Sequence, residues 1–159
     1  MIILNREEMR RAVMRLSMEL IEKSGGTKNL VLVGIRPHGI LLAKKMQREI
    51  KNIEGVQLPL GALDISSEGN NEIDFSVDGK TVALIDDIMY TGRTVRAAVS
   101  ALFALGQPKS IRLYTLIDRG HRELPFRPDG VGKNVPTSSE EIVKVHFIET
   151  DGDDCVILK

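Results

Sequence analysis

The sequence predicts an α/β fold in which a mostly parallel central sheet is flanked by helices. Segments with the helical spacing of apolar residues alternate with short aliphatic runs along most of the chain. The run at 82–85 is continuously apolar, which is typical of a central strand covered on both faces. Because strands joined through helices pair in parallel by right-handed crossovers, this alternation favours a parallel sheet.

The first helix is expected to begin after Asn5. Asn5 and Glu8 have the spacing of a capping box, and the helical pattern ends at Gly25-Gly26. Between them, apolar residues recur at helical spacing, namely Met9, Ala12, Val13, Leu16 and Leu20. The next elements are expected to be a buried strand at 30–35, a helix at 38–50 and a strand of uncertain length at 56–65.

The second half of the chain continues the alternation. Residues 66–72 are polar and turn-rich, and Asp78-Gly79 is expected to turn the chain into the strand at 82–85. The later elements are expected to be a helix at 95–105, a strand at 111–117 and final strands near 143–147 and 156–158. The sequence contains no internal repeat and no low-complexity segment.

The composition is that of an ordinary globular domain. A chain of 159 residues with 42% hydrophobic residues suits one domain spanning 1–159. Its 22 basic and 22 acidic residues balance, so nucleic-acid binding would need a local basic patch. Cys155 is the only cysteine, which excludes an intramolecular disulfide and favours a reducing compartment. Without a signal segment or an apolar run of 18 residues, we expect a cytoplasmic protein with no membrane partner.

Two adjacent carboxylates follow the central apolar run. Asp86 and Asp87 are poorly suited to a core, so we expect them in the crevice above the strand ends, where open α/β sheets bind ligands. Carboxylates there can accept hydrogen bonds from the vicinal hydroxyls of a sugar or meet a hydrated Mg²⁺ through water. The alternative is a solvated turn at the end of a strand.

A small, hydroxyl-rich turn then opens a helix. Thr91, Gly92, Arg93 and Thr94 offer free backbone N–H groups, two hydroxyls and the positive end of a helix dipole, which together favour a phosphate. Arg93 adds a permanent charge, although on a turn it can also face water. The same turn, taken alone, is also ordinary helix-cap chemistry. In sequence after the carboxylates, it predicts a site for ribose 5-phosphate.

The loop after the first strand has a similar arrangement. Arg36, His38 and Gly39 precede a helix in the way that the Thr91 turn does, and they can hold a second anion. The alternative interpretation is structural, because Pro37 is favoured in the first turn of a helix.

Three motifs in the second half of the chain resemble one family. Residues 85–94 resemble the phosphoribosyl diphosphate (PRPP) motif of type I phosphoribosyltransferases. Segments 90–98, 118–125 and 132–138, in that order, are similar to PyrR, a family of bifunctional pyrimidine-operon attenuation regulators and uracil phosphoribosyltransferases. They read Tyr-Thr-Gly-Arg-Thr-Val-Arg-Ala-Ala, Asp-Arg-Gly-His-Arg-Glu-Leu-Pro and Gly-Lys-Asn-Val-Pro-Thr-Ser. The resemblance covers most of the chain, closely from about Lys80 to Ser138.

The resemblance implies a type I phosphoribosyltransferase fold with a small hood, expected at about 118–140. It implies transfer of ribose 5-phosphate from PRPP to uracil, giving UMP and pyrophosphate. Asp86 and Asp87 would be catalytic, Thr91 to Thr94 would bind the phosphate, and Arg36, His38 and Gly39 would form the pyrophosphate loop. Mg²⁺ would be held mainly through the substrate, near Asp86, and the protein would be a homo-oligomer, either a dimer or a tetramer.

The resemblance also implies binding of pyr leader mRNA. His121, Arg127 and Lys133 stand at motif positions associated with RNA, and Arg119 and Arg122 lie in the same irregular stretch. On the first helix, Arg15 lies four residues after Arg11 and would extend this basic patch. The alternative is a solvated loop with ordinary charges. Met14 and Met18 stand where relatives carry Thr and His, which reduces that part of the RNA surface.

Two departures from the family predict weakened transfer. Pro37 and His38 stand where Thr and Arg are usual, so the loop loses a backbone donor and a permanent charge. No Arg or Lys occurs between Lys51 and Lys80, a region that carries the catalytic loop in relatives. The main hypothesis is therefore a nucleotide-sensing RNA regulator with weakened uracil phosphoribosyltransferase activity. The alternatives are a phosphoribosyltransferase for uracil or another nucleobase without RNA binding, and a pocket retained only for folding or assembly.

Overall fold

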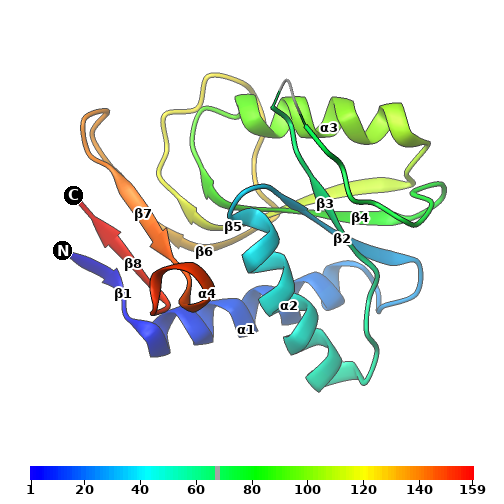
Figure 1. Cartoon of the computed structure of the whole chain (residues 1–159), viewed down its shortest axis with the longest axis horizontal. Coiled ribbons are helices and arrows are strands. Elements are labelled where there is room, and N and C mark those ends of the chain that lie inside the picture. The colour runs from blue at the N-terminus through cyan, green and yellow to red at the C-terminus, as the bar shows by residue number, and fades with distance from the viewer. Residues whose placement is uncertain (67–68) are drawn as a thin grey trace.

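The computed structural model describes residues 1–66 and 69–159. Its centre is a five-stranded sheet with the order β3-β2-β4-β5-β6, in which all neighbouring strands are parallel (Figure 1). These strands are β2 (Leu30–Ile35), β3 (Leu60–Leu63), β4 (Thr81–Met89), β5 (Ser110–Asp118) and β6 (Gly130–Asn134). The α/β class with a mostly parallel central sheet is confirmed.

Helices cover both faces of this sheet. Helices α1 (Arg6–Lys23) and α2 (Gly39–Glu54) lie on one face, and α3 (Arg93–Leu105) lies on the other (Figure 1). Strand β4 serves both hydrophobic cores, because Ala83 and Ile85 face α1 and α2 whereas Val82 and Leu84 face α3. The prediction that residues 82–85 form a central strand buried on both faces is confirmed.

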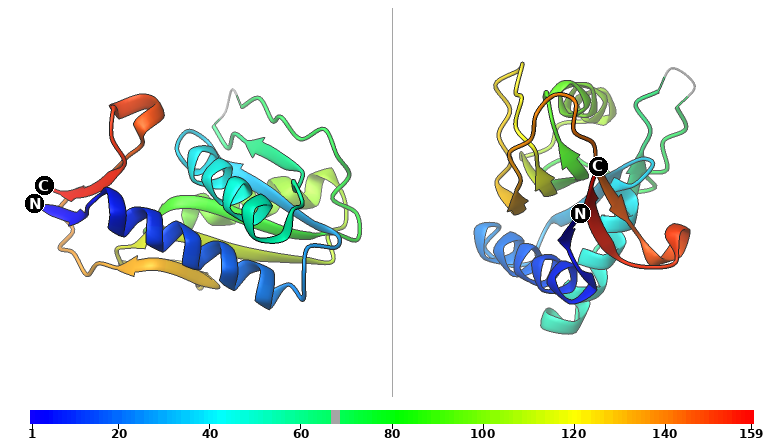
Figure 2. Two further views of the ribbon diagram at one scale, coloured as in Figure 1. Left: turned by 90° about the horizontal axis from the view of Figure 1, so that it is seen from below. Right: turned by 90° about the vertical axis from the view of Figure 1, so that its left-hand side faces the viewer.

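A small antiparallel sheet stands beyond the carboxyl ends of the parallel strands. It has the order β1-β8-β7 and consists of β1 (Ile2–Leu4), β7 (Val143–His146) and β8 (Cys155–Leu158), with α4 (Ile148–Asp151) between the last two. The two chain ends lie side by side in it (Figures 1 and 2). The hood expected at about 118–140 therefore needs correction, because β6 belongs to the main sheet and the small sheet comes from the two ends of the chain.

Most predicted elements have shifted boundaries. The capping box of α1 is confirmed, since Asn5 Oδ1 accepts a hydrogen bond from the Glu8 amide and Glu8 Oε1 accepts one from the Asn5 amide. Helix α2 runs beyond the predicted end at 50 and stops at Gly55, whose φ of 72° is left-handed. The strand expected at 56–65 is only β3, because pairing with β2 extends from Leu60 to Leu63. Strands β1 and β6 and helix α4 were not predicted; each has five residues or fewer.

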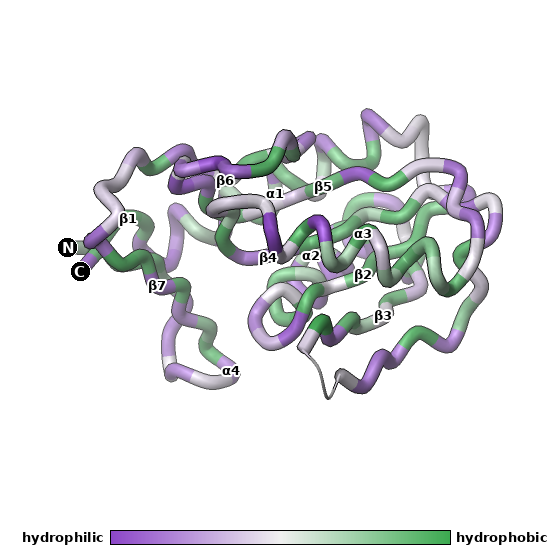
Figure 3. Tube along the Cα trace, turned by 90° about the horizontal axis from the view of Figure 1, so that it is seen from above, coloured by the Kyte–Doolittle hydropathy of each residue, from purple (hydrophilic) through white to green (hydrophobic). Residues whose placement is uncertain are grey.

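Apolar residues are concentrated in the central strands, and the loops at the rim of the molecule are mostly hydrophilic (Figure 3). Within residues 1–66 and 69–159, no helix combines the length and the apolar character needed to cross a membrane.

Tyr114 on β5 gives a testable property of the core. It is fully buried, its hydroxyl has no hydrogen-bond partner in the described part of the chain, and burial raises its pKa from 10.0 to about 12. A raised tyrosine pKa means that the folded state holds the proton more tightly. The unfolding free energy is therefore unaffected by this group below pH 10. It falls as the pH rises from 10 toward 12, by at most about 2.7 kcal/mol.

We therefore expect Tyr114→Phe to flatten the loss of unfolding free energy above pH 10. Urea denaturation of both proteins across this range measures the difference, and the absorbance of tyrosinate separates Tyr114 from the exposed Tyr90. Equal pH slopes in the two proteins would contradict the prediction.

Candidate functional site

Three sequence-predicted segments meet at the carboxyl edge of the main sheet. Asp86 and Asp87 lie in β4, the Thr91 turn joins β4 to α3, and the Arg36 loop joins β2 to α2. Parallel strands bring these ends together because they enter the sheet from the same side. At the start of α2, a Cβ on Gly39 would lie only 2.5 Å from the carbonyl oxygen of Ile85. Close backbone packing therefore sets the Arg36 loop directly against the carboxylates.

Asp86 is more buried than the sequence analysis expected. Pairing with β5 continues through Asp86 to Met89, so the carboxylates belong to the strand and do not follow it. The Asp86 residue is only 9% exposed, and its Oδ1 accepts a hydrogen bond of 2.9 Å from the Asp87 amide. Burial, followed by the negative charge of Asp87, holds the pKa of Asp86 well above its usual range. The protein thus favours the protonated form of this carboxyl group.

Asp87 faces the loop before α2. Its Oδ2 lies 3.5 Å from Nδ1 of His38, and its Oδ1 accepts a hydrogen bond of 3.0 Å from the Ile88 amide. The His38 ring packs against Phe147, which follows β7, with 6.1 Å between ring centroids. Asp87 therefore sits where the main sheet, the Arg36 loop and the small sheet meet.

The turn before α3 presents an open helix N-terminus. Gly92 is the N-cap with a φ of 96°, and Thr91 Oγ1 accepts a hydrogen bond of 3.3 Å from the Arg93 amide. The first turn of α3, which the structure describes in full, carries no acidic residue. The amides of Thr94 and Val95 belong to the helix positions that lack partners within the helix. Together with the helix dipole, they suit an anion such as a phosphate.

Arg93 does not point its charge into this turn. Its Nε and Nη2 lie 3.2 and 3.1 Å from Oε1 of Glu123, and both side chains are exposed. The charge expected to support the phosphate is therefore paired with a carboxylate of the neighbouring segment, which leaves the backbone amides of the turn as the donors that suit an anion.

Arg36 is paired with a residue that the sequence analysis did not consider. Its Nη2 lies 2.9 Å from Oε2 of Glu72, and its buried Nε finds no hydrogen-bond partner among residues 1–66 and 69–159. Glu72 is held on the edge of β3 by two backbone hydrogen bonds with Ala62, of 2.9 and 3.0 Å. Arg36, His38 and Glu72 share the wall of a cavity of about 400 Å³. Apart from residues 67 and 68, which lie outside the described residues, the polar stretch at 66–72 leads the chain back to β3.

The proposed RNA residues fall into two groups. Arg15 and Arg122 form hydrogen bonds within the protein. Arg15 donates to the carbonyls of Val131 and Gly132, and Arg122 donates to the Tyr90 carbonyl and the Asp118 carboxylate. His121 is exposed and contacts the carbonyl of Thr137 through Nε2. Within the described part of the chain, Arg127 and Lys133 form no ion pair. Arg127 lines a cavity of about 660 Å³ under the segment 122–128, and Lys133 is exposed on β6.

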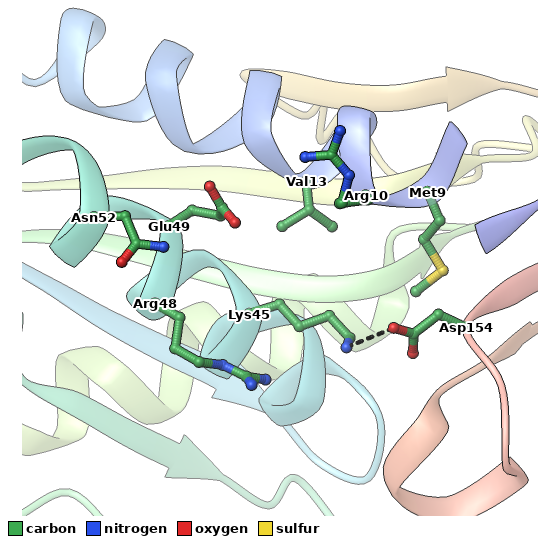
Figure 4. Close-up of a pocket in the computed structure, with 8 residues that line it drawn as sticks. All are labelled: Met9, Arg10, Val13, Lys45, Arg48, Glu49, Asn52 and Asp154. Carbon is green, nitrogen blue, oxygen red and sulfur yellow. Dashed lines mark hydrogen bonds and ion pairs between the residues drawn. The ribbon is translucent and has the colours of Figure 1, made fainter. Parts of the chain in front are cut away.

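A separate cavity of about 310 Å³ lies between α1 and α2 (Figure 4). Its lining contains none of the predicted site residues. Lys45 and Asp154, which form an ion pair of 2.9 Å, both line it, and Arg48 and Glu49 line its α2 side. This cavity is therefore not part of the edge where the carboxylates and the Thr91 turn meet.

The fold and this edge define a phosphoribosyltransferase. Residues 2–149 match the family model described as phosphoribosyl transferase domain. A hypoxanthine phosphoribosyltransferase of Trypanosoma cruzi has the same fold, with a TM-score of 0.81 and 19% sequence identity, over 99% of this chain and 94% of that chain.

The relatives narrow the class to one family. The chain is 50% identical to the bifunctional protein PyrR of Caldicellulosiruptor bescii, over 99% of this chain and 93% of that protein. It is 45% identical to the bifunctional protein PyrR of Clostridioides difficile, over 99% of this chain and 96% of that protein. The chain belongs to the PyrR family.

Proposed function

We propose that this protein is a nucleotide-sensing regulator that binds pyr leader mRNA, and that it also converts uracil and PRPP into UMP and pyrophosphate. The observation that carries the proposal is the juxtaposition of Asp87 with the open N-terminus of α3 at one sheet edge. A ribose 5-phosphate spans these two features, with its hydroxyls toward the carboxylate and its phosphate on the helix amides.

Positioning would do most of the catalytic work. The α3 N-terminus would fix the 5-phosphate, Asp87 would hold the ribose hydroxyls, and Phe147 beside the small sheet would support the His38 ring. The negative charge of Asp87 near the ribose would also favour the cation-like transition state at the anomeric carbon. This chemistry needs no covalent nucleophile.

Mg²⁺ fits the site as a substrate-bound ion. Within residues 1–66 and 69–159, no three His, Cys, Asp or Glu side chains gather as a metal cage. Asp87 offers one carboxylate beside the buried Asp86, so the remaining ligands would be diphosphate oxygens and water, as is usual for this ion. Bound in this way, the ion would neutralise charge on the departing pyrophosphate.

The Arg36–Glu72 pair supports weakened transfer. Pyrophosphate would have to displace the Glu72 carboxylate from the only permanent charge in the loop that precedes α2. Because neither Pro37 nor His38 carries a permanent charge, no second cation of this loop can compensate for the pairing of Arg36.

Glu72→Gln is therefore expected to tighten pyrophosphate binding about two- to fivefold, the range for losing a largely exposed ion-pair competitor. Calorimetric titration with pyrophosphate measures this effect. Glu7→Gln is the matched control, since it breaks the exposed Arg10 pair on α1, away from the pyrophosphate loop and the Thr91 turn. An equal gain in both variants, or none in Glu72→Gln, would contradict the role given to Glu72.

The catalytic half of the proposal is tested by pyrophosphate release from uracil, PRPP and Mg²⁺. Turnover slower than in relatives but above a protein-free blank is expected. Release indistinguishable from the blank would remove the enzymatic half and leave UMP as a signal only.

The regulatory half is tested by binding to a pyr leader hairpin at fixed salt concentration. UMP is expected to tighten binding, and Arg127→Ala is expected to weaken it. Arg48→Ala, on α2 beside the separate cavity, is the control for loss of one positive charge. An RNA affinity that ignores both UMP and Arg127→Ala would favour the alternative, a nucleobase phosphoribosyltransferase without RNA binding. The homo-oligomer stays a prediction, which sedimentation velocity tests.

A further inference from the structure

We propose that Tyr90 is a positioning residue that couples occupancy of the nucleotide pocket to the RNA-contacting segment 119–133. This inference rests on the proposed function and names the side chain that carries its regulation. Tyr90 stands between the end of β4 and the Thr91 turn, so a ligand phosphate on that turn would touch the adjacent backbone. The aromatic ring itself points to the other segment.

Three side chains of the RNA-contacting segment converge on Tyr90. The guanidinium of Arg119 lies over the ring, 4.2 Å from its centroid. The ring of His121 meets it edge to face, with 5.5 Å between centroids and 70° between planes. Arg122 Nη1 donates a hydrogen bond of 2.6 Å to the Tyr90 carbonyl. A single residue next to the phosphate turn is therefore contacted by three basic residues from within the four-residue stretch 119–122.

Backbone hydrogen bonds join the same two segments on either side. The Arg119 amide donates to the Met89 carbonyl at 3.0 Å, and the amides of Glu123 and Leu124 donate to the Thr91 carbonyl at 2.9 and 3.0 Å. These bonds fix the distance between the segments. A substitution at Tyr90 can therefore remove the ring contacts while these backbone hydrogen bonds stay in place.

The contacts extend outward from the ring. Arg119 also donates to Thr137 Oγ1 and to the carbonyls of Ser138 and Glu141, and His121 contacts the Thr137 carbonyl. Arg119 and His121 thus bridge the Tyr90 ring and segment 137–141, so a displaced ring must either break its contacts with these two side chains or move them with it. Binding at the Thr91 turn would thus reposition His121, an exposed residue that we assign to RNA contact.

The size of the expected coupling follows from the contacts. A cation–π contact and an edge-to-face aromatic contact that differ between the free and bound states suffice for a coupling of about 5- to 30-fold. Because coupling is reciprocal, UMP should strengthen RNA binding by the same factor by which RNA strengthens UMP binding.

Three substitutions separate the ring from other roles of Tyr90. Tyr90→Phe keeps the ring, and the Tyr90 hydroxyl makes no hydrogen bond within the described residues, so coupling should be retained. Tyr90→Ala and Tyr90→Leu keep the carbonyl bond to Arg122 but remove the ring, so coupling should fall to about onefold. Tyr90 is 37% exposed, which makes a core defect in the leucine variant small.

The first measurement needs no RNA. The chain has three histidines, so the ring signals in an NMR spectrum can be assigned by substitution. UMP is expected to shift the His121 signals in the wild type and in Tyr90→Phe, and to leave them nearly unmoved in the other two variants at saturation. A full His121 shift in Tyr90→Ala and Tyr90→Leu would overturn the inference.

The second measurement is RNA affinity with and without UMP in the same four proteins. A UMP effect in the wild type and Tyr90→Phe that vanishes in Tyr90→Ala and Tyr90→Leu supports the coupling. A UMP effect that survives in all four overturns it while leaving the regulator function intact. Absence of RNA binding in the wild type would instead remove the proposed regulatory function, and the His121 shifts alone would then decide whether Tyr90 transmits UMP binding.

Discussion

Asp87→Asn is expected to lower kcat/KM for the formation of UMP about 100-fold or more, the scale for removing one electrostatic contact to a charged transition state. The asparagine has the same shape, but it brings no negative charge to the ribose and exchanges one acceptor for a donor. The measurement is steady-state release of pyrophosphate across uracil and PRPP concentrations. The loss should appear in kcat as well as in KM, because the charge stabilises the transition state more than the ground state.

Asp86→Asn is the matched control. Its burial and the neighbouring Asp87 favour the protonated carboxyl, which an asparagine imitates, so the kinetic loss should be clearly smaller. The sign of the pH effect follows from the raised pKa. Stability from the protonated Asp86 is present below the usual carboxyl range and is lost as the pH rises through the folded-state pKa. Asp86→Asn should therefore be the more stable unliganded protein at neutral pH. A kinetic loss equal to that of Asp87→Asn would contradict this division.

Gly39→Ala is expected to destabilise the protein by about 1–3 kcal/mol or more and to abolish UMP binding. The added Cβ would lie 2.5 Å from the Ile85 carbonyl oxygen and 3.1 Å from the Asp86 Cα. Both are backbone atoms of β4, so a change of side-chain rotamer cannot relieve the clash. The helix would have to move away from the strand and take the Arg36 loop with it.

Urea denaturation and UMP titration measure the two effects of Gly39→Ala. Gly79→Ala is the control, because its Cβ meets open space and its φ of +67° adds only backbone strain, roughly 1–2 kcal/mol. That turn lies at the opposite end of β4, so UMP affinity should be unchanged. Wild-type stability and affinity in Gly39→Ala would contradict the close packing at this position.

The local chemistry of the site was predictable from sequence because neighbouring residues carry it. The apolar run at 82–85, the two carboxylates and the Thr91 turn act through the strand and helix that they themselves form. The burial of Asp86 was not predictable in this way. It depends on the register between β4 and β5, which pairs Asp86 with Thr115 and continues the strand to Met89. A single segment does not contain that information.

Contacts between distant segments explain the other differences. The sequence indicated that Arg36 was available to bind an anion, whereas the fold places the Glu72 carboxylate beside it. Arg122 looked like an RNA contact, yet it lies 32 positions from the Tyr90 carbonyl that it holds. Charged residues in irregular segments have no periodicity, so sequence alone does not distinguish a cation that binds a ligand from one that closes a loop.

The hood shows the same limit at the level of topology. Segment 118–140 is rich in turns and charges, and its strand β6 contains two glycines and a lysine, which weakens any strand pattern. The small sheet instead joins the first residues of the chain to the last ones. Only a long-range pairing reveals this arrangement.

The central claim is that the edge formed by Asp87 and the start of α3 binds a pyrimidine ribonucleotide, and isothermal titration with UMP tests it most directly. We expect saturable binding of one UMP per chain, weakened in Asp87→Asn, and a second titration with PRPP and Mg²⁺ that competes for the same site. Absence of UMP binding to the folded wild-type protein, or equal affinities in the wild type and Asp87→Asn, would contradict the claim.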